Sequence, residues 1–105
     1  TFVVCNSSAD ATLLSYCDDT NANPTNFNGD DTRVLQCDGA VLDSIGRIGE
    51  DPGTAWGTDP VTTLDHTLRR DPLLIVGDTD PTDAFDPADE WTSYPVDTYD
   101  GLGVR

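Results

Sequence analysis

The fold is decided by the stretch from Asn28 to Gly46, which reads NGDDTRVLQCDGAVLDSIG and carries the strongest turn signal in the chain. Asp38-Gly39 separates two apolar runs, and these residue types tolerate the positive φ angles that a type I′ turn requires. Because a two-residue turn sets the register of the strands beside it, we expect a β-hairpin. The predicted pairs are Cys37 with Ala40, Gln36 with Val41, Leu35 with Leu42, and Val34 with Asp43.

Both faces of this expected hairpin carry apolar side chains. One face would hold Leu35, Cys37, Ala40 and Leu42, and the other would hold Val34, Val41 and Ile45. A strand pair that is apolar on both faces is typical of the interior of a sandwich. We therefore expect the hairpin to be covered on both sides.

Length and charge narrow the class of protein. The chain has 105 residues, which suits a single small domain. Its net charge of −15 repels phosphate backbones and anionic lipids, so we expect neither a nucleic-acid partner nor a membrane partner. No apolar run approaches the roughly 20 residues that span a bilayer. The first residues lack an initiator Met and belong to an apolar run, which is typical of a processed product or an N-terminal truncation.

Three cysteines, Cys5, Cys17 and Cys37, have spacings that fit no zinc site. The simplest arrangement is one disulfide between Cys5 and Cys17, formed in an oxidising compartment, which indicates a secreted protein. Cys37 would then be left over, either buried or paired with another chain or a missing segment. Three buried free thiols are the alternative.

Short apolar runs separated by Gly-, Pro- and Asp-rich turns continue along the chain and indicate an all-β fold. Trp56 is expected to fill the core, and Phe27 is expected to anchor the long polar loop over 18–31. The run Leu73–Val76 is the most apolar one and predicts a buried strand. Further strands are expected over 2–5, 65–70 and 91–94, with one short helix over 11–17.

A series of motifs follows one another along nearly the whole chain. They are FVVCNSSAD at 2–10, NFNGDD at 26–31, LDSIG at 42–46, DPGTAWG at 51–57, HTLRR at 66–70, FDPADEW at 85–91 and DTYDGLG at 97–103. In content and order they are similar to the lamin-tail-like domain of secreted bacterial proteins, in particular to the copies that precede the catalytic domain of extracellular endonucleases. The resemblance implies an immunoglobulin-like β-sandwich over residues 1–105.

The chain departs from that family at its start. Members usually begin with one or two more strands, which are absent here, as is the nuclease catalytic domain, so nuclease activity is not implied. A sandwich that lacks a strand exposes the N–H and C=O groups of an edge. We expect this edge to be paired by an unseen segment, by a rearrangement, or by a strand from another copy or another domain of the parent protein.

Two functions follow from this expectation. The first is a non-catalytic extracellular structural or interaction module that self-assembles by β-strand addition into an oligomer or a filament. The alternative is an accessory module that binds substrate for a secreted nuclease or other hydrolase, or organises its catalytic domain.

Catalytic residues are not expected, because His66 is the single histidine and has no triad pattern around it. We therefore predict that the chain is not an enzyme. A buried Arg69 or Arg70 paired with an aspartate is the expected structural theme, since arginine suits bidentate pairing. Structural roles are predicted for Asp38, Gly39, Trp56, Arg69, Arg70 and Trp91.

Calcium is the candidate cofactor. One loop places four carboxylates at close spacing, and Ca²⁺ prefers hard oxygen ligands from flexible loops. The candidate ligands are Asp78, Asp80, Asp83 and Asp86. The spacing is not that of an EF-hand, and an ordinary solvated acidic loop is the alternative.

Overall fold

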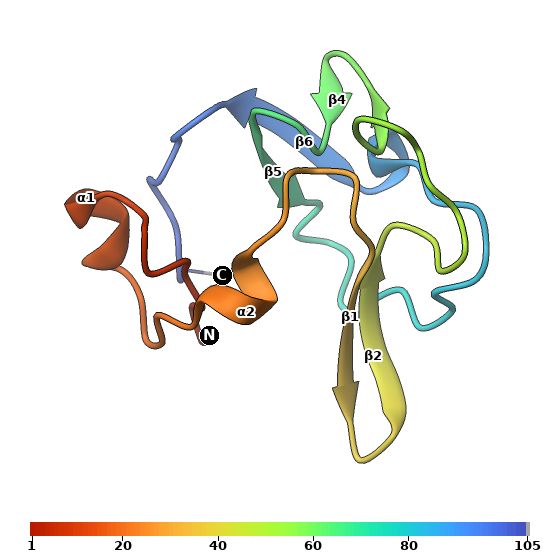
Figure 1. Cartoon of the computed structure of the whole chain (residues 1–105), viewed down its shortest axis with the longest axis horizontal. Helices are drawn as coiled ribbons and strands as arrows, with labels where there is room; N and C mark the ends of the chain where they lie inside the picture. Colours follow the sequence, from red (N-terminus) through yellow and green to blue (C-terminus); the bar gives the residue numbers. More distant parts are fainter. Residues whose placement is uncertain (105) are drawn as a thin grey trace. The chain divides into compact units, whose positions relative to one another are not determined.

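The computed structural model describes residues 1–104, with Ala22 described by its backbone only. The chain forms two compact units (Figure 1). Unit 1 comprises Thr1–Phe27 and Thr98–Arg105, and unit 2 comprises Asn28–Asp97. Most of the regular structure is short antiparallel strands, all of them in unit 2, so the predicted all-β class is confirmed. The prediction of one domain over 1–105 stays a prediction.

Unit 1 is built from two single-turn helices and irregular chain. The helices are α1 (Ala11–Leu14) and α2 (Ala22–Thr25). Asp10 caps α1, because its carboxylate accepts hydrogen bonds from the backbone N–H groups of the first turn. Asn21 caps α2 in the same manner, through the backbone N–H of Asn23 at 3.1 Å. The helix predicted over 11–17 is thus present but shorter.

The strand predicted over 2–5 is wrong. In the described chain it makes an isolated parallel bridge between Val4 and Asp19, and its backbone hydrogen bonds to residues 18 and 19 are not continued into a ladder. The anchoring role predicted for Phe27 is also wrong. The residue is 49% exposed and lies at the surface after α2.

The disulfide predicted between Cys5 and Cys17 is confirmed, with a Cα–Cα distance of 5.9 Å. Cys5 and Val3 are the buried apolar residues of unit 1 among those described. A Cβ on Gly103 would lie 3.2 Å from Cγ2 of Val3, so the C-terminal turn packs against the same small core. Unit 1 is therefore organised around a covalent link rather than a sheet.

The hairpin predicted for unit 2 is confirmed as β1 (Arg33–Cys37) and β2 (Ala40–Ile45). Asp38 and Gly39 both have positive φ, 49° and 82°, as a type I′ turn requires. Next to the turn the register is the predicted one. From Leu35 onward it is shifted by one residue along β2. Leu35 lies opposite Asp43 and Val34 opposite Ser44, so both predicted partners are wrong. The cause is a β-bulge, which inserts one extra residue into β2 and cannot be read from apolar alternation.

Two further hairpin-like sheets complete unit 2. The sequence predicted no strands at the first, where β3 (Gly57–Thr58) pairs with β4 (Val61–Thr62) across a cis Asp59-Pro60 bond. The second pairs β5 (His66–Arg70) with β6 (Trp91–Pro95), close to the strands predicted over 65–70 and 91–94. A 3₁₀ turn, η1 (Pro87–Asp89), precedes β6.

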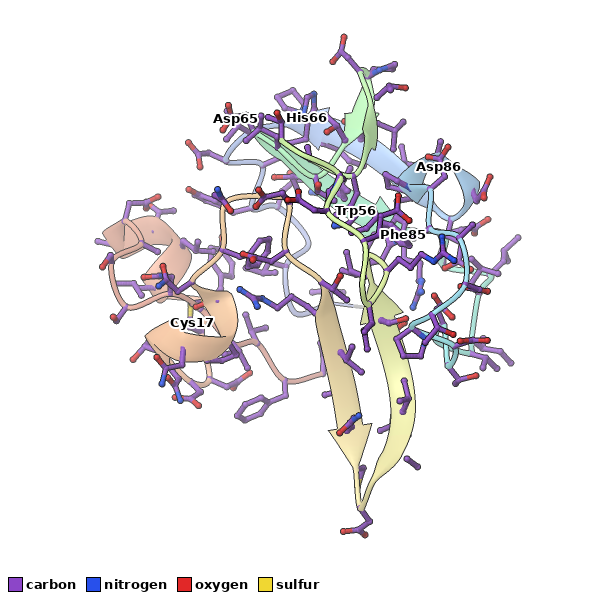
Figure 2. The ribbon with its side chains drawn as sticks, turned by 45° about the vertical axis from the view of Figure 1, so that its right-hand side comes forward. Cys17, Trp56, Asp65, His66, Phe85 and Asp86 are labelled. Carbon is purple, nitrogen blue, oxygen red and sulfur yellow. A yellow bond between two sulfur atoms is a disulfide. The ribbon has the colours of Figure 1, made fainter. Side chains whose placement is uncertain are left out.

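The core of unit 2 is centred on Trp56, which is 3% exposed, as predicted. Phe85 meets its ring edge to face, with ring centroids 5.9 Å apart (Figure 2). Pro87 is fully buried as well. Gly46 is required beside this ring, because a Cβ there would lie 2.7 Å from the indole nitrogen and the backbone has a φ of 82°.

The buried strand predicted for Leu73–Val76 is wrong. Asp71 turns the chain here by accepting a hydrogen bond from the backbone N–H of Leu74, and no strand of the described chain pairs with this run. Leu73 is 84% exposed, and the residues after it are exposed as well. The prediction that the hairpin is covered on both faces is also wrong. No described segment covers Leu35 and Leu42, which remain exposed.

Candidate functional site

The candidate site is the outer half of the first hairpin, residues 34–42, which we call the hairpin arm. Figure 1 shows β1 and β2 extending together away from β5 and β6, with the turn at the far end. Leu35 on β1 is 61% exposed and Leu42 on β2 is 47% exposed. Neighbouring exposed apolar side chains mark candidate interaction sites, and these two leucines make the arm the candidate here.

Four side chains form a hydrogen-bond network at the base of the hairpin. Asp43 accepts hydrogen bonds from Nη1 of Arg70 at 2.7 Å and from the backbone N–H of Asp78 at 2.9 Å. Ser44 is buried and donates its hydroxyl to Asp78 Oδ2 at 3.0 Å. Asp43, which follows the bulge, belongs to this network, and the arm projects from the base.

Arg70 is the centre of the charge network at this base. Its side chain is 16% exposed, and its Nε donates to Glu90 Oε2 at 2.9 Å. Nη2 lies 2.7 Å from the same oxygen as an ion pair without hydrogen-bond alignment, and the guanidinium lies 5.0 Å from the ring centroid of Trp91. Burial acts to lower the pKa of Arg70, but hydrogen bonds to Asp43 and Glu90 outweigh it and raise this pKa. The predicted arginine–aspartate pair is confirmed at Arg70.

Arg69 points to the other side of β5, where its guanidinium lies 4.4 Å from the ring centroid of Tyr94. This cation–π contact joins β5 to β6, in which Tyr94 lies two residues along from Thr92, the partner of Arg69. The structural role predicted for Arg69 thus takes the form of an aromatic contact.

The two edges of the hairpin differ. Gly77 packs closely against β2, where a Cβ would lie 2.7 Å from Cβ of Asp43, so this edge is partly covered. On β1, the pairing of Cys37 with Ala40 directs the backbone groups of Gln36 and Val34 away from β2. Within residues 1–104, no hydrogen bond from outside the hairpin reaches these two residues. The β1 edge is therefore open.

Cys37 is free and exposed, so burial, one of the alternatives left open for it, is wrong. The reason is its place beside the turn, at the end of the arm that no described segment covers. Its pairing with another chain stays a prediction.

The four predicted calcium ligands are not gathered into one site. Asp80 accepts from both the hydroxyl and the backbone N–H of Thr82, and the hydroxyl bond is the main reason that the pKa of Asp80 is lowered. Asp86 caps η1, and Asp78 accepts from Ser44 and from the N–H of Asp80. Across residues 1–104 no three His, Cys, Asp or Glu side chains converge as metal ligands. The calcium site, including Asp83, stays a prediction.

His66 is held in place by the backbone. Its Nδ1 lies 2.7 Å from the carbonyl oxygen of Leu64, a contact that requires the proton on Nδ1. Nε2 lies 3.7 Å from the exposed carboxylate of Asp59. Figure 2 shows His66 near the start of β5, beside Asp65.

No family model, curated protein or solved structure matches the chain. Among the described residues, no helix has the length and apolar character needed to cross a membrane. The lamin-tail-like resemblance therefore stays a prediction, and the function is argued from the geometry.

Sequence reasoning missed the residues that fix the base of the arm. Ser44 and Asp78 belong to segments that are 34 residues apart, and nothing in either segment indicates that they meet. A signal was present at Asp43, because an aspartate inside an apolar strand needs a cation partner when half-buried.

Proposed function

We propose that this chain is a non-catalytic, secreted structural or interaction module of the lamin-tail-like kind, which self-assembles by β-strand addition. The observation that carries the proposal is the hairpin arm, with exposed leucines on both strands and an open edge on β1. An isolated two-stranded hairpin is marginally stable in water, and three or more strands are needed for independent stability. A strand added at the open edge of β1 would supply the third strand that the arm lacks.

The proposal includes an immunoglobulin-like sandwich that is complete only in the assembled state. Three antiparallel strand pairs and a core of Trp56, Phe85 and Pro87 are compatible with parts of such a sandwich. In a sandwich, the apolar faces of two sheets cover one another. The exposed apolar run Leu73–Val76 is further surface that assembly would cover.

Secretion is supported by the Cys5–Cys17 disulfide, because such bonds persist in oxidising compartments. The surroundings of His66 support the proposal that the chain is not a catalyst. Its Nδ1 is engaged by a backbone carbonyl and its nearest carboxylate is almost fully exposed, an arrangement that serves to position a strand.

The test is the molar mass in solution, measured by light scattering during size-exclusion chromatography over a wide range of concentrations. The Cys37→Ser variant is used, so that disulfides between chains cannot produce the result. We expect the mass to rise with concentration above that of a monomer. A monomer at every concentration would overturn self-assembly.

A further inference from the structure

The segment between β5 and β6, residues 71–90, is a long loop whose two ends meet on one ladder, and we call it the strap. Arg70 pairs with Trp91 at the end of the ladder, and the backbone N–H of Asp71 donates to the carbonyl oxygen of Glu90 at 2.8 Å. Loops longer than about 12–15 residues with little regular structure are uncommon, and many of them are functional. A loop that is hinged in this way can lift while its ladder stays paired.

The strap closes over the core of unit 2 with two of its side chains. Phe85 meets the ring of Trp56 edge to face, as Figure 2 shows, and Pro87 is fully buried. A Cβ on Gly57 would lie 2.5 Å from Cγ of Pro87, so the proline ring lies directly against the start of β3. Trp56 is 3% exposed in this closed state. Lifting the strap would therefore uncover the indole.

The carboxylates of the strap have little compensation from cations. Arg47 reaches the middle of the strap, but its Nε donates to the carbonyl oxygen of Thr82 at 2.8 Å and its Nη1 donates to Glu50, outside the strap. Glu90 is paired with Arg70 at the hinge. Within residues 1–104, no ion pair reaches any other carboxylate of the strap.

Charge opposes the closed state. The rest of unit 2 carries nine acidic and four basic residues, so the strap, which has no basic residue, closes onto a part that is negative as well. Uncompensated net charge destabilises a compact state through self-repulsion. The repulsion extends over about 30 Å at 0.01 M salt and about 3 Å at 1 M. The acidic residues of the strap are Asp71, Asp78, Asp80, Asp83, Asp86, Asp89 and Glu90.

We propose that ionic strength controls the strap: dissolved salt keeps it closed over Trp56, and dilution opens it by unscreened repulsion. The closure takes place within one chain, so it goes beyond the proposed self-assembly and does not depend on it. A diffuse atmosphere of monovalent cations supplies the screening, without a coordinated ion. Unit 2 is thus built to keep its aromatic core covered in a concentrated salt medium.

Acrylamide quenching of Trp56 fluorescence tests the closure, because acrylamide is uncharged and reaches the indole when the strap is open. The protein carries Cys37→Ser, which prevents disulfides between chains, and Trp91→Phe, which leaves Trp56 as the single tryptophan. We expect the quenching constant to be about threefold larger in 0.01 M NaCl than in 1 M NaCl. KCl and tetramethylammonium chloride should act as NaCl does, since screening depends on ionic strength alone.

Two double variants separate the strap from the net charge. Asp83→Asn/Asp89→Asn removes two exposed strap charges whose side chains make no hydrogen bond within residues 1–104, and should lower the ratio to below about twofold. Asp38→Asn/Asp65→Asn is the matched control, because both residues are exposed and have positive φ, 49° and 53°, which asparagine tolerates. Asp38 lies at the far end of the hairpin arm, and Figure 2 shows Asp65 apart from Phe85. The control should keep the threefold ratio.

Equal quenching at both salt concentrations would overturn the proposal. An effect of Na⁺ or K⁺ that tetramethylammonium does not reproduce would also overturn it, because a bound ion would then be the cause. The same decrease in both double variants would assign the effect to net charge rather than to the strap. Loss of amide protection along β5 and β6 at low salt would mean that unit 2 unfolds as a whole. A quenching constant that changes with protein concentration would mean that contact between copies covers Trp56, and each of these last three results contradicts the strap as well.

Discussion

Units 1 and 2 are folded by different means. Unit 1 contains no strand in its described residues, and its small core surrounds the Cys5–Cys17 disulfide. Unit 2 contains every strand pair, a packed aromatic core at Trp56 and the charge network of Arg70. A chain segment too short to bury much apolar surface depends on a covalent link, whereas a longer one can be held by packing.

The same difference bears on where the proposed interaction surface lies. Packing in unit 2 is concentrated at Trp56 and at the base of the first hairpin, and it does not extend to the arm. In a unit that is held by packing, the apolar side chains that lie beyond the packed region stay exposed. Both tryptophans lie in unit 2, so their fluorescence reports on this unit alone and separates the two kinds of stabilisation.

The largest effect is expected from Trp56→Ala, which empties the core of unit 2. Deleting a buried tryptophan side chain costs about 3–5 kcal/mol of unfolding free energy. Urea unfolding followed by the fluorescence of Trp91 measures the loss. Leu73→Ala is the matched control, since Leu73 is 84% exposed and should change stability by less than about 0.5 kcal/mol. Similar losses in the two variants would show that Trp56 is not the centre of the core.

Removal of the disulfide should act on unit 1. In the Cys5→Ser/Cys17→Ser protein, a loop with a sequence separation of 12 is no longer closed, which costs about 3 kcal/mol in the chain-entropy account. Amide hydrogen exchange should accelerate around α1, while the unfolding seen by tryptophan fluorescence stays unchanged. Cys37→Ser is the control and should alter neither signal, because Cys37 is free and exposed.

A smaller effect is expected from Arg70→Ala, which leaves Asp43 and Glu90 without their cation. Removing one partner of a buried pair costs about 3–5 kcal/mol, but these carboxylates are a third exposed. Solvent screening lowers the expected loss to about 1–2 kcal/mol. Arg47→Ala, which breaks an exposed pair with Glu50, should cost less than about 1 kcal/mol in the same urea titration. The reverse order would contradict a central role for Arg70.

The sequence was informative where the signal is local. The Asp38-Gly39 turn requires positive φ at both residues. This signal places the turn and the first two residue pairs across the hairpin, Cys37 with Ala40 and Gln36 with Val41. The bulge was invisible, because apolar residues stand on both sides of it and either register satisfies the pattern. Apolar character also predicted burial at Leu73, where it is wrong. Burial depends on whether a partner surface is present, and no residue in that run carries this information.

The stability that unit 1 loses in acid should depend on the hydroxyl of Tyr99. Tyr99 donates to Asp10 at 2.6 Å and is the main cause of the lowered pKa of Asp10, ahead of the backbone N–H of Leu13. A lowered pKa contributes stability that is present above the unfolded value, 3.8, and is lost as the pH falls through the folded value. Tyr99→Phe should return this pKa toward 3.8, measured by NMR titration. The pKa of Asp80 is the internal control, since Thr82 lowers it and the substitution leaves that contact intact.

The smallest effect is expected from calcium, and it bears directly on the comparison. A bound ion would cross-link the loop over 78–86, and unit 2 would then, like unit 1, be stabilised by a cross-link. Asp78, Asp80 and Asp86 instead accept separate local hydrogen bonds, and no three ligating side chains converge among residues 1–104. We therefore expect added Ca²⁺ or EDTA to move the melting temperature by less than about 2 °C. A saturable rise that Asp83→Asn abolishes would establish the ion as a ligand, and unit 2 would then combine packing with a metal cross-link.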